Sequence, residues 1–224
     1  MRLGVLFSGG KDSCYALLKT IEEVVCLITV VSENPASYMF HTPNIKLAEK
    51  QANAIGLPIL IQKTKGEKEK ELIDLEKAIE KSKEKYKIDG VVTGALKSVY
   101  QSSRIKKICD KLGLECINPL WQKDQIELLE ELLKNNFDVI ITGVFALGLD
   151  EFLGRKIDEK FIEEIKILSE KYKINPAGEG GEFESLVLDA PFFKKKLKVE
   201  KSHVEKDKEG GRVLVLDSVK IVRK

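Results

Sequence analysis

The sequence predicts an α/β protein, in which a parallel-sheet domain is followed by a smaller C-terminal α+β portion. Two observations predict this fold class. Short runs rich in Val, Ile and Leu alternate with segments of helical periodicity from the start of the chain. After about Gly148 the pattern changes, because three strand-like runs follow the last helix with no helix between them. With 224 residues the chain has room for both parts, which we place at 1–147 and 148–224.

The first part alternates strands and helices. The run LGVLF at 3–7 has strand length, and the segment from about Asp12 places apolar residues at i, i+3, i+4 and i+7, as an amphipathic helix does. Near-continuous Val and Ile in the longer strands indicates a parallel sheet covered on both faces. The other strands are expected at 24–32, 57–63, 89–96, 115–120 and 137–146, and the other helices at 44–55, 67–87, 103–112 and 124–134.

The second part begins with a helix at 158–172, followed by the glycine-rich segment PAGEGGE at 176–182. Three strand-like runs complete it, at 184–189, 196–204 and 212–222. The last two runs are joined at KDKEGG and predict an antiparallel hairpin.

Charge and cysteine content exclude several classes of protein. The 38 basic and 36 acidic side chains nearly cancel, so no overall field recruits nucleic acid or an anionic membrane. The four cysteines form no Cys-x-x-Cys pair and are interpreted as small core residues. No signal peptide and no run of about 20 apolar residues is found. We therefore expect a cytoplasmic protein with neither a membrane nor a nucleic acid as partner.

The segment SGGKDS at 8–13 lies where the first strand meets the first helix. In a parallel sheet such a helix N-terminus offers unpaired N–H groups and a positive dipole end to phosphates. The two glycines let the backbone approach phosphate oxygens, the serines donate hydroxyls and the lysine supplies charge. Asp12 either caps the helix or helps to hold Mg²⁺. The cofactor-binding residues expected here are Ser8, Gly9, Gly10, Lys11, Asp12 and Ser13.

This segment lacks the Gly-x-x-x-x-Gly-Lys spacing that serves attack at a terminal phosphate. Its Ser-Gly-Gly-x-Asp-Ser pattern resembles the PP-loop family. That resemblance implies an adenine nucleotide alpha hydrolase-like, Rossmann-like domain that cleaves ATP between its α and β phosphates. A substrate oxygen would be adenylylated and pyrophosphate would leave. It also implies that the adenosine is received after the second strand, near His41 and Asn44.

Three further groups of residues sharpen the resemblance. They are SYMFHTPN at 37–44, GALKSVYQSSR at 94–104 with NPLW at 118–121, and GEGGEFES at 178–185. Together with the loop they resemble the diphthine-ammonia ligase family, over about residues 2–191. Membership implies that ATP activates the carboxyl of diphthine, a modified histidine on elongation factor 2. Ammonium would then supply the nitrogen of the amide diphthamide, with AMP and pyrophosphate as the other products.

The chemistry agrees with this resemblance. An acyl-adenylate makes the carboxyl reactive without an enzyme nucleophile, so no catalytic cysteine is required. Only neutral ammonia attacks, and its conjugate acid needs a base near neutral pH. We expect Glu182 or Glu179 to bind ammonium or to take a proton from it, and Lys11 and Asp12 to complete the catalytic set.

The remaining candidates follow the fourth strand or lie in the glycine-rich segment. Gly94 is expected at the nucleotide, and Ser98 is a weaker candidate beside it. Diphthine carries a quaternary ammonium, which aromatic faces and carboxylates bind when it is desolvated. Tyr100, Trp121 and Phe183 are therefore candidates for a cage, with ordinary packing as the alternative. The expected substrate-binding residues are Tyr100, Gln101, Arg104, Gly180, Gly181 and Glu184.

Two other functions stay open from the sequence. One is adenylation of a different acceptor, such as tRNA, and the other is nucleotide sensing without chemistry. A homodimer is compatible with the sequence. The segment 148–224 is expected to close over the site and to recognise the protein substrate.

Overall fold

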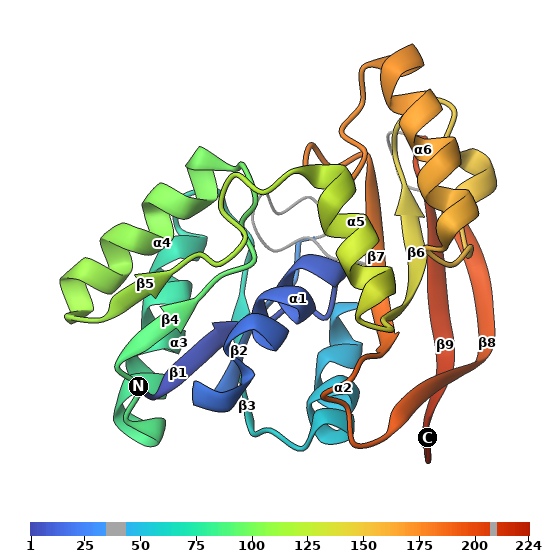
Figure 1. Cartoon of the computed structure of the whole chain (residues 1–224). Helices are drawn as coiled ribbons and strands as arrows, with labels where there is room; N and C mark the ends of the chain where they lie inside the picture. Colours follow the sequence, from blue (N-terminus) through green and yellow to red (C-terminus); the bar gives the residue numbers. More distant parts are fainter. Residues whose placement is uncertain (35–43, 207–209) are drawn as a thin grey trace. The chain divides into compact units, whose positions relative to one another are not determined.

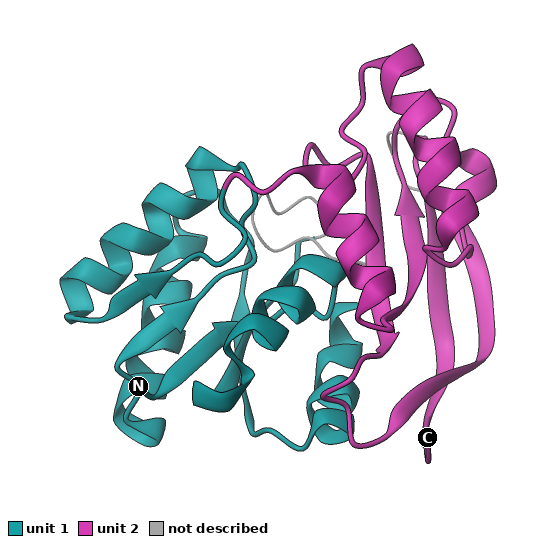
Figure 2. Cartoon of the chain, in the orientation of Figure 1, with its two compact units in different colours: residues 1–121 teal, residues 122–224 magenta. Residues whose placement is uncertain are grey.

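The computed structural model describes residues 1–34, 44–206 and 210–224 (Figure 1). These residues form two compact units, Met1–Trp121 and Gln122–Lys224 (Figure 2). The boundary that we expected between residues 147 and 148 therefore falls inside the second unit. No helix among the described residues is both long enough and apolar enough to span a bilayer.

Unit 1 contains a five-stranded parallel sheet with the order β3-β2-β1-β4-β5. The chain moves outward from β1 to β3 and then returns to β4 on the other side of β1. The carboxyl ends of β1 and β4 therefore form the topological switch point, where such sheets bind ligands. The strands are β1 Leu3–Leu6, β2 Val24–Ser32, β3 Ile59–Thr64, β4 Gly90–Val92 and β5 Glu115–Ile117.

The helices that connect these strands confirm the predicted alternation. The fourth helix begins at Val99, four residues before the predicted start at Ser103. Ser98 is its N-cap, and its side chain accepts a hydrogen bond from the Gln101 amide at 3.3 Å. The helices are α1 Lys11–Thr20, η1 Ile21–Glu23, η2 Ile45–Leu47, α2 Ala48–Ile55, α3 Glu71–Tyr86 and α4 Val99–Leu112.

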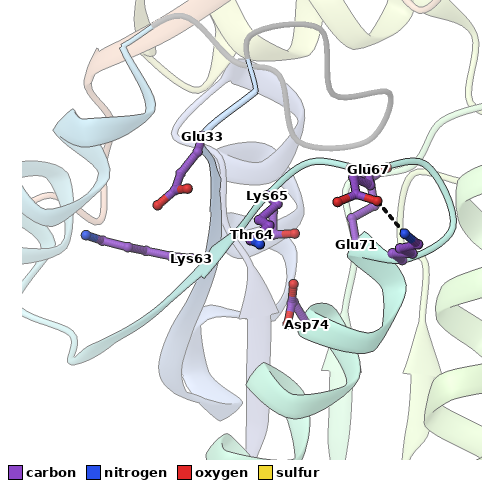
Figure 3. A pocket seen from close by; sticks show the side chains of 8 residues that line it. Glu33, Lys63, Thr64, Lys65, Glu67, Glu71 and Asp74 are labelled. Carbon is purple, nitrogen blue, oxygen red and sulfur yellow. Dashed lines mark hydrogen bonds and ion pairs between the residues drawn. The ribbon is translucent and has the colours of Figure 1, made fainter.

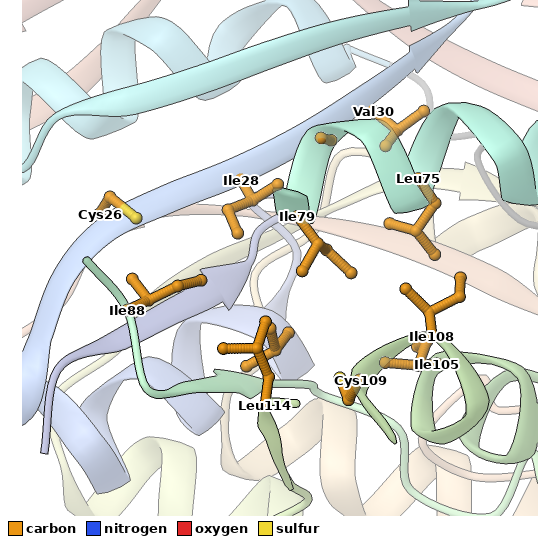
Figure 4. Packing of buried hydrophobic residues seen from close by; sticks show 12 residues of the cluster. Cys26, Ile28, Val30, Leu75, Ile79, Ile88, Ile105, Ile108, Cys109 and Leu114 are labelled. Carbon is orange, nitrogen blue, oxygen red and sulfur yellow. The ribbon is translucent and has the colours of Figure 1, made fainter. Parts of the chain in front are cut away.

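One core of unit 1 holds α3 and α4 against the sheet (Figure 4). The helix α3 is rich in Lys and Glu, and its charged side chains are largely exposed. Its apolar stripe is nevertheless fully buried, with Leu75, Ala78 and Ile79 each 0% exposed. Burying one such Leu or Ile side chain stabilises the fold by about 1.5–3 kcal/mol. The stripe therefore fixes α3, and with it the loop that follows β3.

Unit 2 contains a four-stranded antiparallel sheet with the order β7-β6-β9-β8. The prediction that 137–146 belongs to the parallel sheet is wrong, because β6 pairs with β7 in the antiparallel sense. A central antiparallel strand buried on both faces carries the same continuous apolar run as a parallel strand. The elements are α5 Gln125–Lys134, β6 Asp138–Val144, η3 Asp150–Phe152, α6 Glu159–Tyr172, β7 Phe183–Asp189, β8 Lys196–Lys206 and β9 Arg212–Val222.

The predicted hairpin strands are confirmed as β8 and β9, which pair antiparallel from Lys196 opposite Val222 to Lys206 opposite Arg212. Residues 207–209 of the connection lie outside the described part. β8 is an edge strand, and its segment 200–206 is exposed on both faces. Its charged side chains, Glu200, Lys201, Glu205 and Lys206, oppose pairing of this edge with other chains.

His203 provides a pH-dependent contact in this hairpin. Its Nδ1 lies 2.9 Å from an Asp217 oxygen and its Nε2 lies 3.0 Å from a Glu205 oxygen. The hydrogen bond to Asp217, followed by that to Glu205, raises the pKa of His203 above its usual value. Because the folded-state pKa is the higher one, this stabilisation is complete below about pH 6.5 and disappears as pH rises through the folded pKa.

We therefore expect an NMR titration to give a His203 pKa above the ordinary value, and Asp217→Asn to lower it. The chain has two histidines, so a His203→Gln variant assigns the signals. A His203 pKa that is the same in the wild type and in Asp217→Asn would show that the Asp217 contact does not form in solution.

Candidate active site

The segment Ser8–Ser13, the predicted phosphate-binding loop and called the phosphate loop below, begins at a point fixed by the neighbouring strand β2. The Phe7 amide donates to the Ile28 carbonyl at 2.8 Å, and the Thr29 hydroxyl donates to the Phe7 carbonyl at 2.6 Å. The helix α1 then starts at Lys11 with Gly10 as its N-cap, which provides no side-chain cap. No side chain of the N-cap therefore covers the first N–H groups of α1. These groups lie at the positive end of the helix dipole.

Two serines close the loop on itself. The Ser8 and Ser13 Oγ atoms lie 3.1 Å apart, and the Ser13 hydroxyl donates to the Gly10 carbonyl at 3.1 Å. The Gly10 amide donates to the Ser8 Oγ at 3.4 Å. This compact arrangement gathers two hydroxyls and the N-terminus of α1 within six consecutive residues, as the sequence predicted.

The first turn of α1 holds a pair of opposite charges. Lys11 Nζ lies 2.9 Å from Asp12 Oδ2, and Lys11 is 4% exposed. The other carboxylate oxygen, Asp12 Oδ1, is buried and accepts no hydrogen bond within the described part of the chain. Asp12 is not the N-cap, because that position belongs to Gly10. Of the two roles that the sequence left open for Asp12, capping is therefore wrong.

A buried glutamine holds the loop from the side of α2. The Gln51 amide donates to the Gly9 carbonyl at 2.9 Å, and Gln51 is 0% exposed. Gly9 has a φ of +80°, and a Cβ on it would lie 1.9 Å from Gln51 Oε1. Only glycine fits both the conformation and the contact. Gln51 therefore fixes the turn that precedes α1.

The loop after β4 packs directly on the first turn of α1. A Cβ on Gly94 would lie 2.8 Å from Asp12 C and 2.8 Å from Ser13 N. Both are backbone atoms that cannot give way without moving the helix N-terminus. The structure thus places Gly94 at the switch point beside the phosphate loop, where its small size permits the close approach of the two segments.

Asn118 joins two of the sequence segments that carried the resemblance. Its side chain accepts from the Thr93 hydroxyl at 2.5 Å and donates to the Ser102 hydroxyl at 3.2 Å. The Ala95 amide donates to the same Thr93 oxygen at 3.1 Å. The segment after β4 and the segment after β5 are therefore held in one hydrogen-bonded network at the carboxyl edge of the sheet.

Tyr100 and Arg104 both contact Glu69, just before α3. The Tyr100 hydroxyl donates to Glu69 Oε1 at 2.8 Å, and Arg104 Nη2 lies 2.6 Å from the same oxygen. Hydrogen bonds from Arg104 and then Tyr100 lower the pKa of the Glu69 carboxyl. The Arg104 guanidinium covers the Tyr100 ring at 3.4 Å from its centroid. One face of this candidate cage residue is therefore already occupied by a cation.

A hollow of about 360 Å³ lies nearby, at the ends of β2 and β3 and the start of α3 (Figure 3). Glu67 and Lys70 form an ion pair across part of it at 2.6 Å. Its lining is charged apart from Thr64, which favours a hydrated surface hollow over an adenine pocket with apolar walls. The lining residues are Glu33, Lys63, Thr64, Lys65, Glu67, Lys70, Glu71 and Asp74.

In unit 2, the glycine-rich segment is organised around the Glu182 carboxylate. Glu182 Oε1 accepts from the Asn175 amide at 2.8 Å and from Asn175 Nδ2 at 2.7 Å. Glu182 Oε2 accepts from the Gly180 amide at 2.8 Å. Glu179 is half-buried, whereas Gly180 and Gly181 are exposed. Glu182, one of the two carboxylates that the sequence offered for handling ammonium, thus holds its own loop.

Comparison with known proteins agrees with this division of the chain. The diphthamide synthase N-terminal domain matches residues 1–116, and the diphthamide synthase C-terminal domain matches residues 124–221. The chain belongs to the diphthamide synthase family. The two family domains coincide with the two compact units, since the chain passes from one unit to the other between residues 121 and 122.

Several curated proteins named diphthine-ammonia ligase are similar to this diphthamide synthase family member. The protein from Bos taurus and the one from Homo sapiens are each 34% identical to it over 232 residues, with 91% of this chain and 85% of each relative covered. The protein from Rattus norvegicus is 36% identical over 225 residues, with 90% and 84% covered.

A solved structure from Methanocaldococcus jannaschii, described as a predicted subunit of tRNA methyltransferase, is also similar. The two structures superpose with a TM-score of 0.44, and the sequences are 20% identical. The match covers 85% of the present chain and 98% of the Methanocaldococcus jannaschii chain. A likeness at this level says nothing about the activity of the present chain.

The structure brings together part of the predicted site of this family member. Residues 8–13 and Gly94 meet at the switch point of unit 1, whereas Tyr100 and Arg104 lie around Glu69. Gln101 uses its backbone amide at the α4 N-cap. The remaining candidates of unit 2 are Glu179, Gly180, Gly181, Glu182 and Glu184. His41 lies outside the described residues.

The aromatic candidates divide between core and surface. Phe183 is 3% exposed and packs edge-on against Phe161 at a centroid distance of 5.8 Å, so its ring belongs to the core of unit 2. A role for Phe183 in a cage is therefore wrong. Trp121, the last residue of unit 1, is 36% exposed.

Sequence reasoning missed two buried glutamines that hold loops, Gln51 and Gln125. Each lies on the buried stripe of its helix, with apolar residues on the same face. A glutamine at such a position carries one side-chain amide, whose oxygen and NH2 group must both find partners inside the protein. This interruption of an apolar stripe is the signal by which both could have been found.

We expect Gln51→Ala to raise the Kd for ATP by about tenfold, because the Gly9 carbonyl loses its buried hydrogen bond and the loop loses its fixed conformation. Isothermal titration calorimetry checks this. Glu49→Ala, an exposed position on the same helix, is the control. Equal ATP affinities for Gln51→Ala and the wild type would contradict a role for Gln51 in holding the loop.

We expect Gly94→Ala to weaken ATP binding by about tenfold or more, since the added Cβ displaces the first turn of α1 by contact with its backbone. Gly4→Ala is the matched control, because its closest contact would be a side-chain atom, Ile28 Cδ1 at 2.9 Å, rather than the backbone of α1. If Gly94→Ala binds ATP as well as Gly4→Ala does, the contact with α1 does not control the loop.

Proposed function

We propose that this protein catalyses the ATP-dependent amidation of diphthine to diphthamide, with ammonium as the nitrogen donor. The observation that carries the proposal is the position of residues 8–13, with their two serines and the N-terminus of α1, at the switch point of unit 1 in a chain that belongs to the diphthamide synthase family. The relatives covered over most of their length are named diphthine-ammonia ligase, which is a ligase that forms a carbon–nitrogen bond.

The first half-reaction is adenylation of the diphthine carboxylate. A carboxylate oxygen attacks the α-phosphorus of ATP, the bond between the α-phosphorus and the bridging oxygen breaks, and pyrophosphate leaves. Ser8, Ser13 and the N-terminus of α1 bind the departing pyrophosphate through hydroxyls and N–H groups. Lys11 supplies positive charge where negative charge accumulates on that leaving group.

The residues at the start of α1 also fit a magnesium ion. Mg²⁺ prefers carboxylate oxygens, keeps several waters and binds through one or two carboxylates together with substrate phosphates. The buried Asp12 Oδ1 is an oxygen of this kind and accepts no hydrogen bond within the described residues. Asp12 would therefore hold Mg²⁺, which neutralises phosphate charge when it is bound.

The second half-reaction forms the amide. Ammonium first loses a proton to a carboxylate of the protein, and the ammonia nitrogen attacks the carbonyl carbon of the acyl-adenylate. The carbon–oxygen bond to AMP breaks, AMP leaves with the electron pair, and the nitrogen releases one further proton. The glycine-rich segment of unit 2 carries the two candidate carboxylates, Glu179 and Glu182.

The proposed protein substrate is diphthine-bearing elongation factor 2, which unit 2 recognises. This assignment is supported by the sequence resemblance and by the diphthine named in the relatives. We place the reaction in the cytoplasm. The candidates for contact with the substrate remain Tyr100, Gln101, Arg104, Gly180, Gly181 and Glu184, and a homodimer is compatible with the fold.

We expect AMP to form from labelled ATP only when both ammonium and diphthine-bearing elongation factor 2 are present. A Ser8→Ala, Asp12→Ala double variant should lose at least about 100-fold in AMP formation, because it lacks a phosphate ligand and the proposed magnesium ligand. Asp110→Ala, which removes a surface ion pair with Lys106, is the control and should leave the rate unchanged.

The controls of this assay separate the other functions. AMP formation with ammonium-independent turnover on tRNA would indicate adenylation of a different acceptor. ATP binding without AMP under any of these conditions would indicate nucleotide sensing and would contradict the ligase function.

A further inference from the structure

A half-buried asparagine after β5 holds both ends of the loop that joins β4 to α4. Asn118 Oδ1 accepts from the Thr93 hydroxyl at 2.5 Å, just before this loop. Asn118 Nδ2 donates to the Ser102 hydroxyl at 3.2 Å, in the first turn of α4. One side-chain amide therefore sets the span of residues 94–98. We call Thr93, Asn118 and Ser102 the Asn118 bridge.

The asparagine of the bridge is itself held by the backbone around it. The Thr93 amide donates to the Ile117 carbonyl at 2.9 Å, which continues the parallel pairing of β4 with β5. In the turn that follows, the Asn118 carbonyl accepts from the Trp121 amide at 3.2 Å. The sheet therefore sets the position from which Asn118 reaches the loop.

The loop that the bridge spans is the one that packs on the start of α1. The Thr93 hydroxyl also accepts from the Ala95 amide at 3.1 Å, so the backbone is fixed on both sides of Gly94. Gly94 lies against the backbone of Asp12 and Ser13, at a distance that leaves no room for a Cβ. A movement of this loop is therefore transmitted to the N-terminus of α1.

We propose that Asn118 is a positioning residue for nucleotide binding. The bridge fixes Gly94 against α1 and so holds the hydroxyls and N–H groups of the phosphate loop in the arrangement that binds the pyrophosphate part of ATP. Groups that are already in place bind a ligand without the cost of ordering them. The proposal rests on the proposed function, which makes ATP the substrate, and all residues of the bridge belong to unit 1.

Two substitutions of Thr93, which is 2% exposed, separate hydrogen bonding from packing. Thr93→Val keeps the shape of the side chain and removes the hydroxyl, so that Asn118 Oδ1 loses its donor and the Ala95 amide loses its acceptor. Thr93→Ser keeps the hydroxyl and removes a buried methyl group. If the bridge acts through its hydrogen bonds, the valine variant is the more damaging one for ATP binding.

Thr64 offers a matched control on a neighbouring strand. It is the last residue of β3 and is 4% exposed. Its hydroxyl accepts from the Gly66 amide at 3.3 Å, two residues further on, just as the Thr93 hydroxyl accepts from the Ala95 amide. Thr64→Val therefore removes a comparable buried hydrogen bond outside the bridge and leaves the support of Gly94 unchanged.

We expect Thr93→Val and Asn118→Leu each to raise the Kd for ATP by about tenfold or more, with Thr93→Ser and Thr64→Val within about twofold of wild type. Ser102→Ala should raise this Kd by about three- to tenfold. It should add nothing to Asn118→Leu, because both changes break the same hydrogen bond.

Isothermal titration calorimetry with ATP and Mg²⁺ measures these affinities, and circular dichroism at the temperature of the titration checks that each variant is folded. If Asn118→Leu does not fold, the Thr93 and Ser102 variants test the bridge without it.

Wild-type affinity for ATP in folded Thr93→Val would overturn the role of Asn118, as would a larger loss of affinity in Thr93→Ser than in Thr93→Val. Equal losses in Thr64→Val and Thr93→Val would overturn it too, because any buried threonine hydroxyl would then have the same effect. Absence of ATP binding in the wild type is a different result, since it contradicts the proposed function itself.

Discussion

The close approach of two backbone segments at the switch point of unit 1 is the constraint on which the site depends. The loop after β4 can lie on the first turn of α1 only because Gly94 has no side chain. The turn before α1 requires a left-handed residue at Gly9, and the carbonyl of that residue is held by Gln51. These contacts fix the N-terminus of α1 before any nucleotide binds, so its dipole and N–H groups act without reorganisation.

The same device recurs in unit 2. A glutamine on the buried face of α5 holds the glycine-rich segment, much as the glutamine on α2 holds the phosphate loop. In both places a rigid helix supplies one amide whose two ends cannot reach water. The amide must therefore find protein partners, and the loop that provides them is fixed in return. Loops anchored in this way can be exposed and still keep one conformation.

Much of the fold was predictable, because it depends on local patterns. The strands and helices of unit 1 followed from apolar periodicity, and the start of the first helix followed from the glycines of the phosphate loop. The sheet that contains β6 was not predictable. Six of the seven residues of β6 are buried. A continuous apolar run predicts that a strand is buried on both faces, but it does not predict whether the neighbouring strands are parallel or antiparallel.

The sequence by itself determined the phosphate loop, because residues 8–13 are contiguous and their chemistry follows from their order at a strand-to-helix junction. It also carried the family resemblance, which depends on short motifs. Only the tertiary structure decided that Glu182 holds its own segment, that Phe183 lies in the core and that Gln51 and Gln125 anchor loops. Each of these depends on contacts between residues that are separated along the chain, and distances between such residues are set by packing rather than by sequence order.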